Sequence, residues 1–139
     1  MTARKIKIKN PKLLLAPLKE AHVELAYLFG STIQGDSIRG SDVDLAILLP
    51  RNTDLHGRFN TRLGLIATLS KLYSKEFDVV VLNDVPSLIF KHLIISQGRP
   101  VYRCDETTQA LFESKVLAEY FDFRPCIDQF NAAYVAKNS

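Results

Sequence analysis

Three short apolar segments constrain the fold of this chain more than any other feature of its sequence. Residues 23–29, 42–49 and 77–82 are rich in branched and aromatic side chains, and turn-forming residues follow them. Such segments are typical of buried β-strands, and we expect the first two strands to pair. Each is far shorter than the roughly 20 apolar residues that cross a bilayer. The sequence therefore predicts no membrane span.

Most of the remaining sequence has helical periodicity. In residues 53–73, apolar side chains recur at helical spacing as Leu55, Phe59, Leu63, Ile66, Leu69 and Leu72. Another helix is expected from about Pro86 to Gly98, because proline favours the first turn of a helix and glycine its end. A brief strand is expected at Val101-Tyr102. Strands that alternate with helices indicate an α/β fold, with a small mixed sheet flanked by helices.

Prolines mark the expected interruptions of the helical segments. A first helix is expected after Asn10 and Pro11, with Pro17 kinking or interrupting it. Residues 107–134 again have a helical pattern. Because the residue before a proline disfavours helix, Arg124-Pro125 predicts two terminal helices in this segment.

Length and composition indicate one compact domain. The chain has 139 residues, of which 47% are hydrophobic and 24% are charged, as is usual for globular domains. A chain of this length buries roughly two-thirds of the surface that its unfolded form exposes, which is enough for one core. We therefore treat residues 1–139 as a single domain, in which residues 1–9 form a basic arm or an edge strand and residues 105–139 form a helical tail.

The charge balance argues against direct nucleic-acid binding. There are 18 basic and 15 acidic side chains, a net charge of +3, whereas a nucleic-acid footprint needs clustered basic residues. Residues 4–9 form a basic cluster, but their alternation of charge with isoleucine is typical of an edge strand or a solvated arm. Cys104 and Cys126 lack the paired spacing of a zinc site and are expected to be buried or half-buried thiols. No secretion-signal pattern is present, which predicts a cytoplasmic protein.

A turn followed by two carboxylates stands between the first two expected strands. Gly30-Ser31 ends the first strand, and after the ten residues 32–41, Asp42-Val43-Asp44 opens the second. Because residues two apart on a strand face the same side, Asp42 and Asp44 are expected to project together. Neighbouring carboxylates repel each other unless a cation neutralises them, and their oxygens suit Mg²⁺ that bridges to phosphates. Gly30 lets the backbone approach a phosphate closely, and the Ser31 hydroxyl can donate a hydrogen bond to it, so the segment indicates a triphosphate site.

This pattern resembles the signature of the DNA polymerase beta type nucleotidyltransferase superfamily, which is Gly-Ser, a spacer of about this length, and Asp-x-Asp. The resemblance implies a nucleotidyltransferase fold, ATP as the substrate, and two Mg²⁺ ions held by Asp42 and Asp44. It also implies a third carboxylate on a neighbouring strand, for which Asp78 stands first and Glu76 second. Asp78 would bind the ion nearest the acceptor and act as the base, while Gly30-Ser31 would hold the β and γ phosphates.

Several residues near the signature have open roles. Ile33 and Gln34 stand where the superfamily often has a small residue and then a basic one, and Arg39 is the candidate for the missing cation. An alternative role for Asp78 is to cap its strand or to pair with Lys75. The histidines are scattered singly and are assigned surface or packing positions: His22, His56 and His92.

The resemblance extends from about residue 23 to residue 134, including the tail segment Tyr120-Phe121-Asp122-Phe123-Arg124-Pro125, and the chain looks like the minimal nucleotidyltransferase (MNT) antitoxins encoded beside HEPN toxins. This implies transfer of AMP from ATP to a tyrosine of a partner HEPN ribonuclease, which silences it. Two alternatives stay open. The chain could mask the toxin by binding alone, an alternative that the departures at Ile33 and Gln34 keep open, or it could act on a small hydroxyl compound. Oligomerisation with the partner also stays open.

The tail is rich in aromatic side chains. Five of them exceed what two short helices need to cover one small sheet: Tyr120, Phe121, Phe123, Phe130 and Tyr134. We therefore expect some of them to be exposed in the isolated protein. Because an exposed apolar patch marks a contact surface, the tail is the expected docking surface for the partner.

Overall fold

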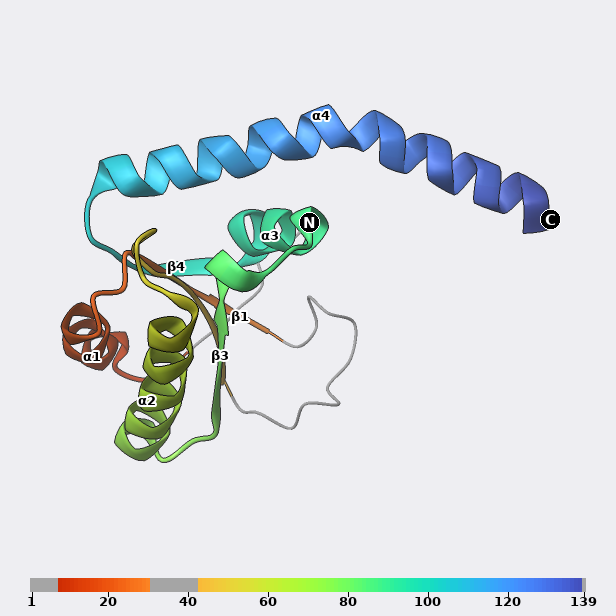
Figure 1. Cartoon of the computed structure of the whole chain (residues 1–139). Helices are drawn as coiled ribbons and strands as arrows, with labels where there is room; N and C mark the ends of the chain where they lie inside the picture. The colour runs from red at the N-terminus through yellow and green to blue at the C-terminus, as the bar shows by residue number, and fades with distance from the viewer. Residues whose placement is uncertain (1–7, 31–42, 139) are drawn as a thin grey trace.

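A four-stranded mixed sheet with helices on both faces forms the centre of the molecule (Figure 1). The computed structural model describes residues 8–30 and 43–138, and its strands are β1 (Leu25–Phe29), β2 (Val43–Leu48), β3 (Phe77–Val81) and β4 (Arg99–Arg103). Their order across the sheet is β3-β2-β1-β4, with β2 and β3 parallel and the other neighbouring pairs antiparallel. The expected α/β fold and the pairing of the first two strands are confirmed. The brief strand expected at Val101-Tyr102 lies within β4.

The helices form a layer on each side of the sheet. A 3-10 helix (Pro11–Leu14) leads into α1 (Leu15–Glu20), and α2 (Leu55–Tyr73) connects β2 to β3. After a second 3-10 helix (Leu82–Asp84), α3 (Leu88–Gln97) connects β3 to β4, and α4 (Glu106–Asn138) follows β4. Buried residues of α1 and α2 cluster with one face of the sheet, whereas Ile94 of α3 and the partly buried Phe112 of α4 pack against the other. Figure 1 shows the same division of the helices between the two faces.

Alternation along the strands assigns each side chain to one of these two faces. Leu45 and Ile47 of β2 pack with Leu69 of α2, whereas Ala46 packs with Ile94 of α3. Each fully buried leucine or isoleucine contributes about 1.5–3 kcal/mol through burial. Because successive strand residues point to opposite faces, this arrangement turns residue 44 toward the side of α3 and α4.

The first helical segment changes from a 3-10 helix to an α-helix at Leu15, before Pro17 and not at it. Asn10 has a φ of 50°, and its side chain makes no capping hydrogen bond. Pro11 begins a 3-10 helix as expected at a helix start, and the α-helix begins at Leu15. Pro17 therefore lies in the first turn of α1, where a backbone N–H has no acceptor within the helix and its loss costs little.

The buried side of α2 differs from the apolar pattern that predicted the helix. Leu65 and Leu69 are buried. Four apolar residues of the expected pattern are instead exposed: Leu55, Phe59, Leu63 and Leu72. Counting back from Leu69 at helical spacing, the sheet-facing positions are 65, 62 and 58, and two of these are Arg62 and Arg58. The periodicity therefore predicted the helix, but of its repeat only Leu69 is fully buried and Ile66 packs partly against the core.

The expectation of two terminal helices is wrong. The structure has one helix of 33 residues, α4, with Pro125 inside it. A proline removes one backbone hydrogen bond and strains one turn, at a cost of about 3 kcal/mol. The helix continues because long helical segments on both sides add one hydrogen bond for each further residue. In Figure 1 the second half of α4 extends past α3 and the sheet.

The first half of α4 is fixed to the sheet and to α3. The hydroxyl of Tyr27 on β1 donates a 2.6 Å hydrogen bond to the Glu113 carboxylate, and the side-chain amide of Gln109 donates one of 3.1 Å to the same group. Burial raises the pKa of the Tyr27 hydroxyl, and the hydrogen bond and negative charge of Glu113 raise it further. Tyr120 stacks on His92 of α3 with ring centroids 3.8 Å apart, so His92 has the packing position expected of it.

Candidate functional site

The register of β2 and β3 places two of the expected site carboxylates side by side. Asp44 is paired with Asp78 in the parallel ladder, and neighbouring strands lie about 4.8 Å apart. Paired residues point to the same face of a sheet, so both carboxylates project on the side that carries Ala46. Glu76, the second candidate for the third carboxylate, precedes β3 and is not the residue paired with Asp44.

Burial distinguishes the two carboxylates. Asp44 is 4% exposed and is the one buried charged residue among the side chains that the structure describes. The side chain of Asp78 is 25% exposed. Burying a carboxylate is costly unless hydrogen bonds or a cation stabilise its charge, and a second carboxylate beside it adds repulsion. Such a pair is typical of a cation site.

The start of the expected phosphate turn lies at the same end of the sheet. Phe29, the last residue of β1, is paired with Asp44, and Gly30 follows it directly. The structure therefore brings Gly30 to the end of the sheet where β2 and β3 begin. The remaining expected site residues lie outside the described residues and stay predictions: Ser31, Arg39 and Asp42.

Asp78 has a cationic neighbour that the sequence did not predict. Arg62 of α2 approaches Asp78 Oδ1 with Nη2 at 3.4 Å, and its Nε donates a 2.6 Å hydrogen bond to the carbonyl oxygen of Val79. Arg62 stands between apolar residues of a helical pattern, far from the Gly-Ser and Asp-x-Asp motif, so the motif gave no reason to select it. The available signal was its helical spacing to Leu65 and Leu69, which puts it on the sheet-facing side of α2.

The described carboxylates fit part of a Mg²⁺ site. Mg²⁺ is usually bound through one or two carboxylates together with substrate phosphates and water, and Asp44 and Asp78 provide oxygen ligands of that kind. Among the side chains that the structure describes, no group of three His, Cys, Asp or Glu residues could hold a metal. The third carboxylate that the sequence predicts, Asp42, lies outside the described residues and stays a prediction.

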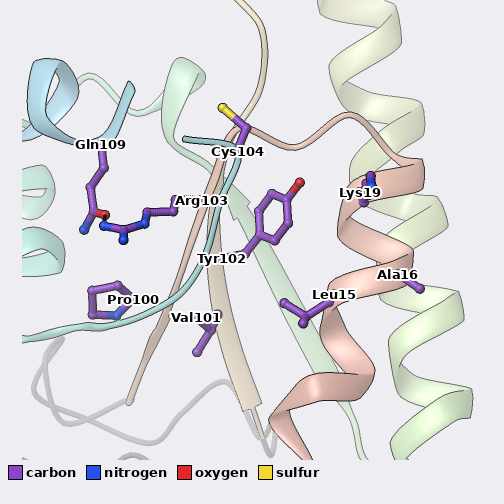
Figure 2. A pocket seen from close by; sticks show the side chains of 9 residues that line it. All are labelled: Leu15, Ala16, Lys19, Pro100, Val101, Tyr102, Arg103, Cys104 and Gln109. Atoms are coloured by element: carbon purple, nitrogen blue, oxygen red, sulfur yellow. Dashed lines mark hydrogen bonds between the residues drawn. The ribbon is translucent and has the colours of Figure 1, made fainter. Parts of the chain in front are cut away.

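A larger cavity, of about 910 Å³, lies at the opposite edge of the sheet, between α1 and β4. Figure 2 shows the Tyr102 side chain pointing from β4 toward α1, into this space. The lining contains no carboxylate: Leu15, Ala16, Lys19, Pro100, Val101, Tyr102, Arg103, Cys104 and Gln109. Because β1 and β2 separate this cavity from Asp78, it does not belong to the candidate site.

Cys104, which lines this cavity, is exposed. The expectation of a buried or half-buried thiol is therefore wrong for this residue. Cys104 lies just beyond the end of β4 and before the start of α4, and the connection between two elements lies on the surface of a protein.

Comparison with known protein families identifies the class. The family model described as polymerase beta, nucleotidyltransferase matches residues 14–107, more than half of the chain. All four strands lie within this range, as do Gly30, Asp44 and Asp78. The chain therefore belongs to the polymerase beta family of nucleotidyltransferases, as its motif suggested.

Individual relatives include a protein adenylyltransferase and antitoxins in solved toxin–antitoxin structures. Protein adenylyltransferase MntA of Shewanella oneidensis is 28% identical over 98 residues, which cover 70% of this chain and 66% of that relative's length. A crystal structure of a toxin–antitoxin with AMP-PNP aligns over 87% of this chain and 98% of the other, with 25% identity and a TM-score of 0.62. The structure of tri-AMPylated Shewanella oneidensis HEPN toxin in complex with MNT antitoxin aligns over 87% and 95%, with 22% identity and a TM-score of 0.59. The last of these likenesses shows the fold alone.

No helix within residues 8–30 and 43–138 combines the length and the apolar character needed to cross a membrane.

Proposed function

We propose that this protein is an antitoxin-type adenylyltransferase that moves AMP from ATP to a tyrosine hydroxyl of a partner HEPN ribonuclease and thereby neutralises it. The observation that carries the proposal is the paired position of Asp44 and Asp78, beside the glycine that begins the signature turn. The name of the relative MntA, protein adenylyltransferase, supports the reaction. The AMP-PNP bound in a similar toxin–antitoxin structure supports ATP as the substrate.

In the proposed reaction, the tyrosine oxygen attacks the α phosphorus of ATP in line. A new oxygen–phosphorus bond forms as the bond between the α phosphorus and the pyrophosphate oxygen breaks. Asp78 is the more exposed of the two described carboxylates, so an incoming acceptor can reach it, and it accepts the phenolic proton. Gly30 and Ser31 hold the β and γ phosphates, and Arg39 adds positive charge for the departing pyrophosphate.

Asp42, Asp44 and Asp78 are the residues that would hold two Mg²⁺ ions. When bound, these ions supply positive charge next to the attacking and leaving oxygens. Asp44 is suited to a fixed ligand position because its strand is paired on both sides, with β1 and with β3. Asp78 lies on a terminal strand of the described sheet and is suited to meet the acceptor.

The exposed apolar side chains of α4 form the docking surface in this proposal. Phe121 and Phe123 are 56% and 48% exposed, which agrees with the expectation that part of the aromatic tail stays uncovered. Both α4 and the paired carboxylates lie on the same side of the sheet. A toxin held on α4 could therefore reach Asp78 without passing around the sheet, as a positioned acceptor must.

The proposal includes the setting of the reaction. The chain acts as one domain over residues 1–139, with residues 105–139 as the docking tail. It acts in the cytoplasm, where ATP is available to the reaction. No separate acceptor domain is needed, because the acceptor is itself a folded protein.

Transfer of label from α-labelled ATP to the purified toxin tests the proposal. With Mg²⁺, wild-type protein should label the toxin, and Asp44→Asn should not. A protein that masks the toxin by binding alone would inhibit it without labelling it. A protein that acts on a small hydroxyl compound would label such a compound with no toxin present, so the three functions give different results.

A further inference from the structure

Two arginines occupy the sheet-facing side of α2 at its N-terminal half. Arg58 and Arg62 continue the helical spacing of the buried residues Leu65 and Leu69. The two leucines pack into the core, whereas the two arginines line a groove of about 270 Å³ along β3. Asp78 lines the same groove. This part of α2 therefore borders the candidate site rather than the core.

The guanidinium of Arg62 is held at two points of β3. Its Nε donates a 2.6 Å hydrogen bond to the Val79 carbonyl, and its Nη2 lies 3.4 Å from Asp78 Oδ1. β3 is a terminal strand of the sheet that the described residues form, so Val79 can offer its carbonyl to a side chain. Because a guanidinium is planar and rigid, a fixed Nε also fixes the direction of Nη2. The backbone of β3 thereby sets where positive charge stands beside Asp78.

This contact addresses a problem that the paired carboxylates create. Asp44 and Asp78 occupy paired positions on neighbouring strands, and their like charges favour rotation of the more exposed Asp78 away from Asp44. A cation fixed at Oδ1 opposes that rotation and limits the orientations that the Asp78 carboxylate can adopt. Arg62 is itself partly exposed, at 37%, so the pair contributes little to stability. Its main effect is on orientation.

We propose that Arg62 is a positioning residue for the nucleotidyl transfer, which holds the Asp78 carboxylate ready to bind Mg²⁺ and to accept the proton of the acceptor. This inference rests on the proposed function for its catalytic consequence. Its effect on Mg²⁺ binding can be measured separately.

Arg58 is a matched control. It lies one turn before Arg62 on the same side of α2, lines the same groove, and pairs through Nε with Asp84 Oδ1 at 2.8 Å. Asp84 follows the end of β3, whereas Asp78 lies at its start. Arg58→Met therefore removes an ion pair and a hydrogen bond to a backbone carbonyl, that of Thr53, from the same helix and leaves Asp78 with its neighbour.

The kinetic test compares Arg62→Met, Arg62→Lys and Arg58→Met with the wild type in labelling of the toxin. Loss of a partner that orients a metal ligand typically costs about 10- to 100-fold, so Arg62→Met should lower kcat by about that factor with the KM for ATP within about 2-fold. Arg62→Lys should be impaired as well, because a lysine keeps the positive charge but lacks the planar guanidinium with its fixed set of N–H donors. Added guanidinium ion should restore part of the activity of Arg62→Met. Equal losses in Arg58→Met and Arg62→Met would overturn the proposal.

A binding test needs no activity. The rise in melting temperature with a non-hydrolysable ATP analogue is followed as Mg²⁺ is added, for wild type, Arg62→Met and Arg58→Met. Without its positioning contact, Asp78 should bind Mg²⁺ more weakly, so the half-maximal Mg²⁺ concentration should rise about tenfold in Arg62→Met alone. An unchanged or lower value would overturn the positioning role. If wild-type protein labels no acceptor, the proposed function fails, and this Mg²⁺ value still decides the role of Arg62.

Discussion

Asp44 is a buried carboxylate that lies beside the second carboxylate Asp78. Removing its charge should therefore not lower the stability of the metal-free protein. The Asp42→Asn, Asp44→Asn double variant should be at least as stable as wild type without metal, because repulsion around Asp78 is relieved. Mg²⁺ with an ATP analogue should raise the melting temperature of wild type by several degrees, since a ligand at 100 times its Kd adds about 2.7 kcal/mol to the native state. The double variant should lose this response in thermal melts.

Asp84→Asn is the control for this prediction. Asp84 pairs with Arg58 beyond the end of β3, whereas Asp78 lies at the start of that strand, so the Asp84 variant should keep the response to Mg²⁺. A full response in the double variant would place the metal at other residues.

Tyr27 links the centre of the sheet to α4, and it makes the free energy of unfolding depend on pH in the alkaline range. Its pKa is raised above 10.0, first by burial and then by the hydrogen bond and charge of Glu113. The folded protein therefore keeps the proton at a pH where the unfolded chain releases it. The stabilisation is fully present below about pH 10 and is lost above it, at up to about 1.4 kcal/mol per pH unit.

Urea unfolding between pH 8 and 11 tests this linkage. Tyr27→Phe should be less stable than wild type near neutral pH by about 1.5–3 kcal/mol, because it loses a hydrogen bond to a charged group. The difference should shrink as the pH rises above 10. Parallel stability curves for the two proteins would show that Tyr27 does not carry the effect.

At the scale of elements, the sequence predicted those strands and helices that depend on a local pattern of residues. Short branched segments marked β1, β2 and β3, because such side chains fit a pleated, buried surface. Two features depend on longer-range terms, which a local pattern does not contain. The apolar repeat of α2 includes residues such as Phe59 that are exposed, because the sheet, and not the repeat, decides which face is covered. Pro125 did not end α4, because its cost is local and helix propagation continues on both sides of it.

The aromatic half of α4 should separate docking from chemistry. Phe123→Asp should weaken toxin binding by at least tenfold, because it puts a charge into the apolar contact. The variant should keep the thermal response to Mg²⁺ and the ATP analogue, because that response depends on the carboxylates of the sheet. Asp44→Asn should show the opposite behaviour, with binding retained and transfer lost. Isothermal titration calorimetry with the toxin measures the first effect.

Leu63→Asp is a matched control for this docking prediction. Leu63 is 45% exposed, close to the 48% of Phe123, but it lies on α2, which covers the other face of the sheet. Its variant should bind the toxin normally. Equal weakening by both substitutions would contradict a docking surface on α4.

At the scale of the whole molecule, the candidate site follows from topology as much as from the motif. The spacing of Gly30 and Asp44 predicted a phosphate and metal site, and the strand order brings Asp78 beside Asp44 as the resemblance implied. Arg62 could not be predicted in the same way, because its contact with Asp78 arises from the packing of α2 beside β3. The same topology separates the larger cavity beside β4 from the carboxylates. The proposed transfer therefore takes place at the end of the sheet where β2 and β3 begin.

Intact-mass and peptide mass spectrometry of the toxin co-expressed with this protein tests the central claim most directly. With wild-type protein, the toxin should carry one or more AMP groups, and peptide mapping should locate them on a tyrosine. Co-expression with Asp44→Asn should give unmodified toxin that still copurifies with the variant. A toxin that is unmodified in the presence of wild-type protein, ATP and Mg²⁺, and is nevertheless inhibited stoichiometrically, would contradict the transfer reaction and establish neutralisation by binding alone.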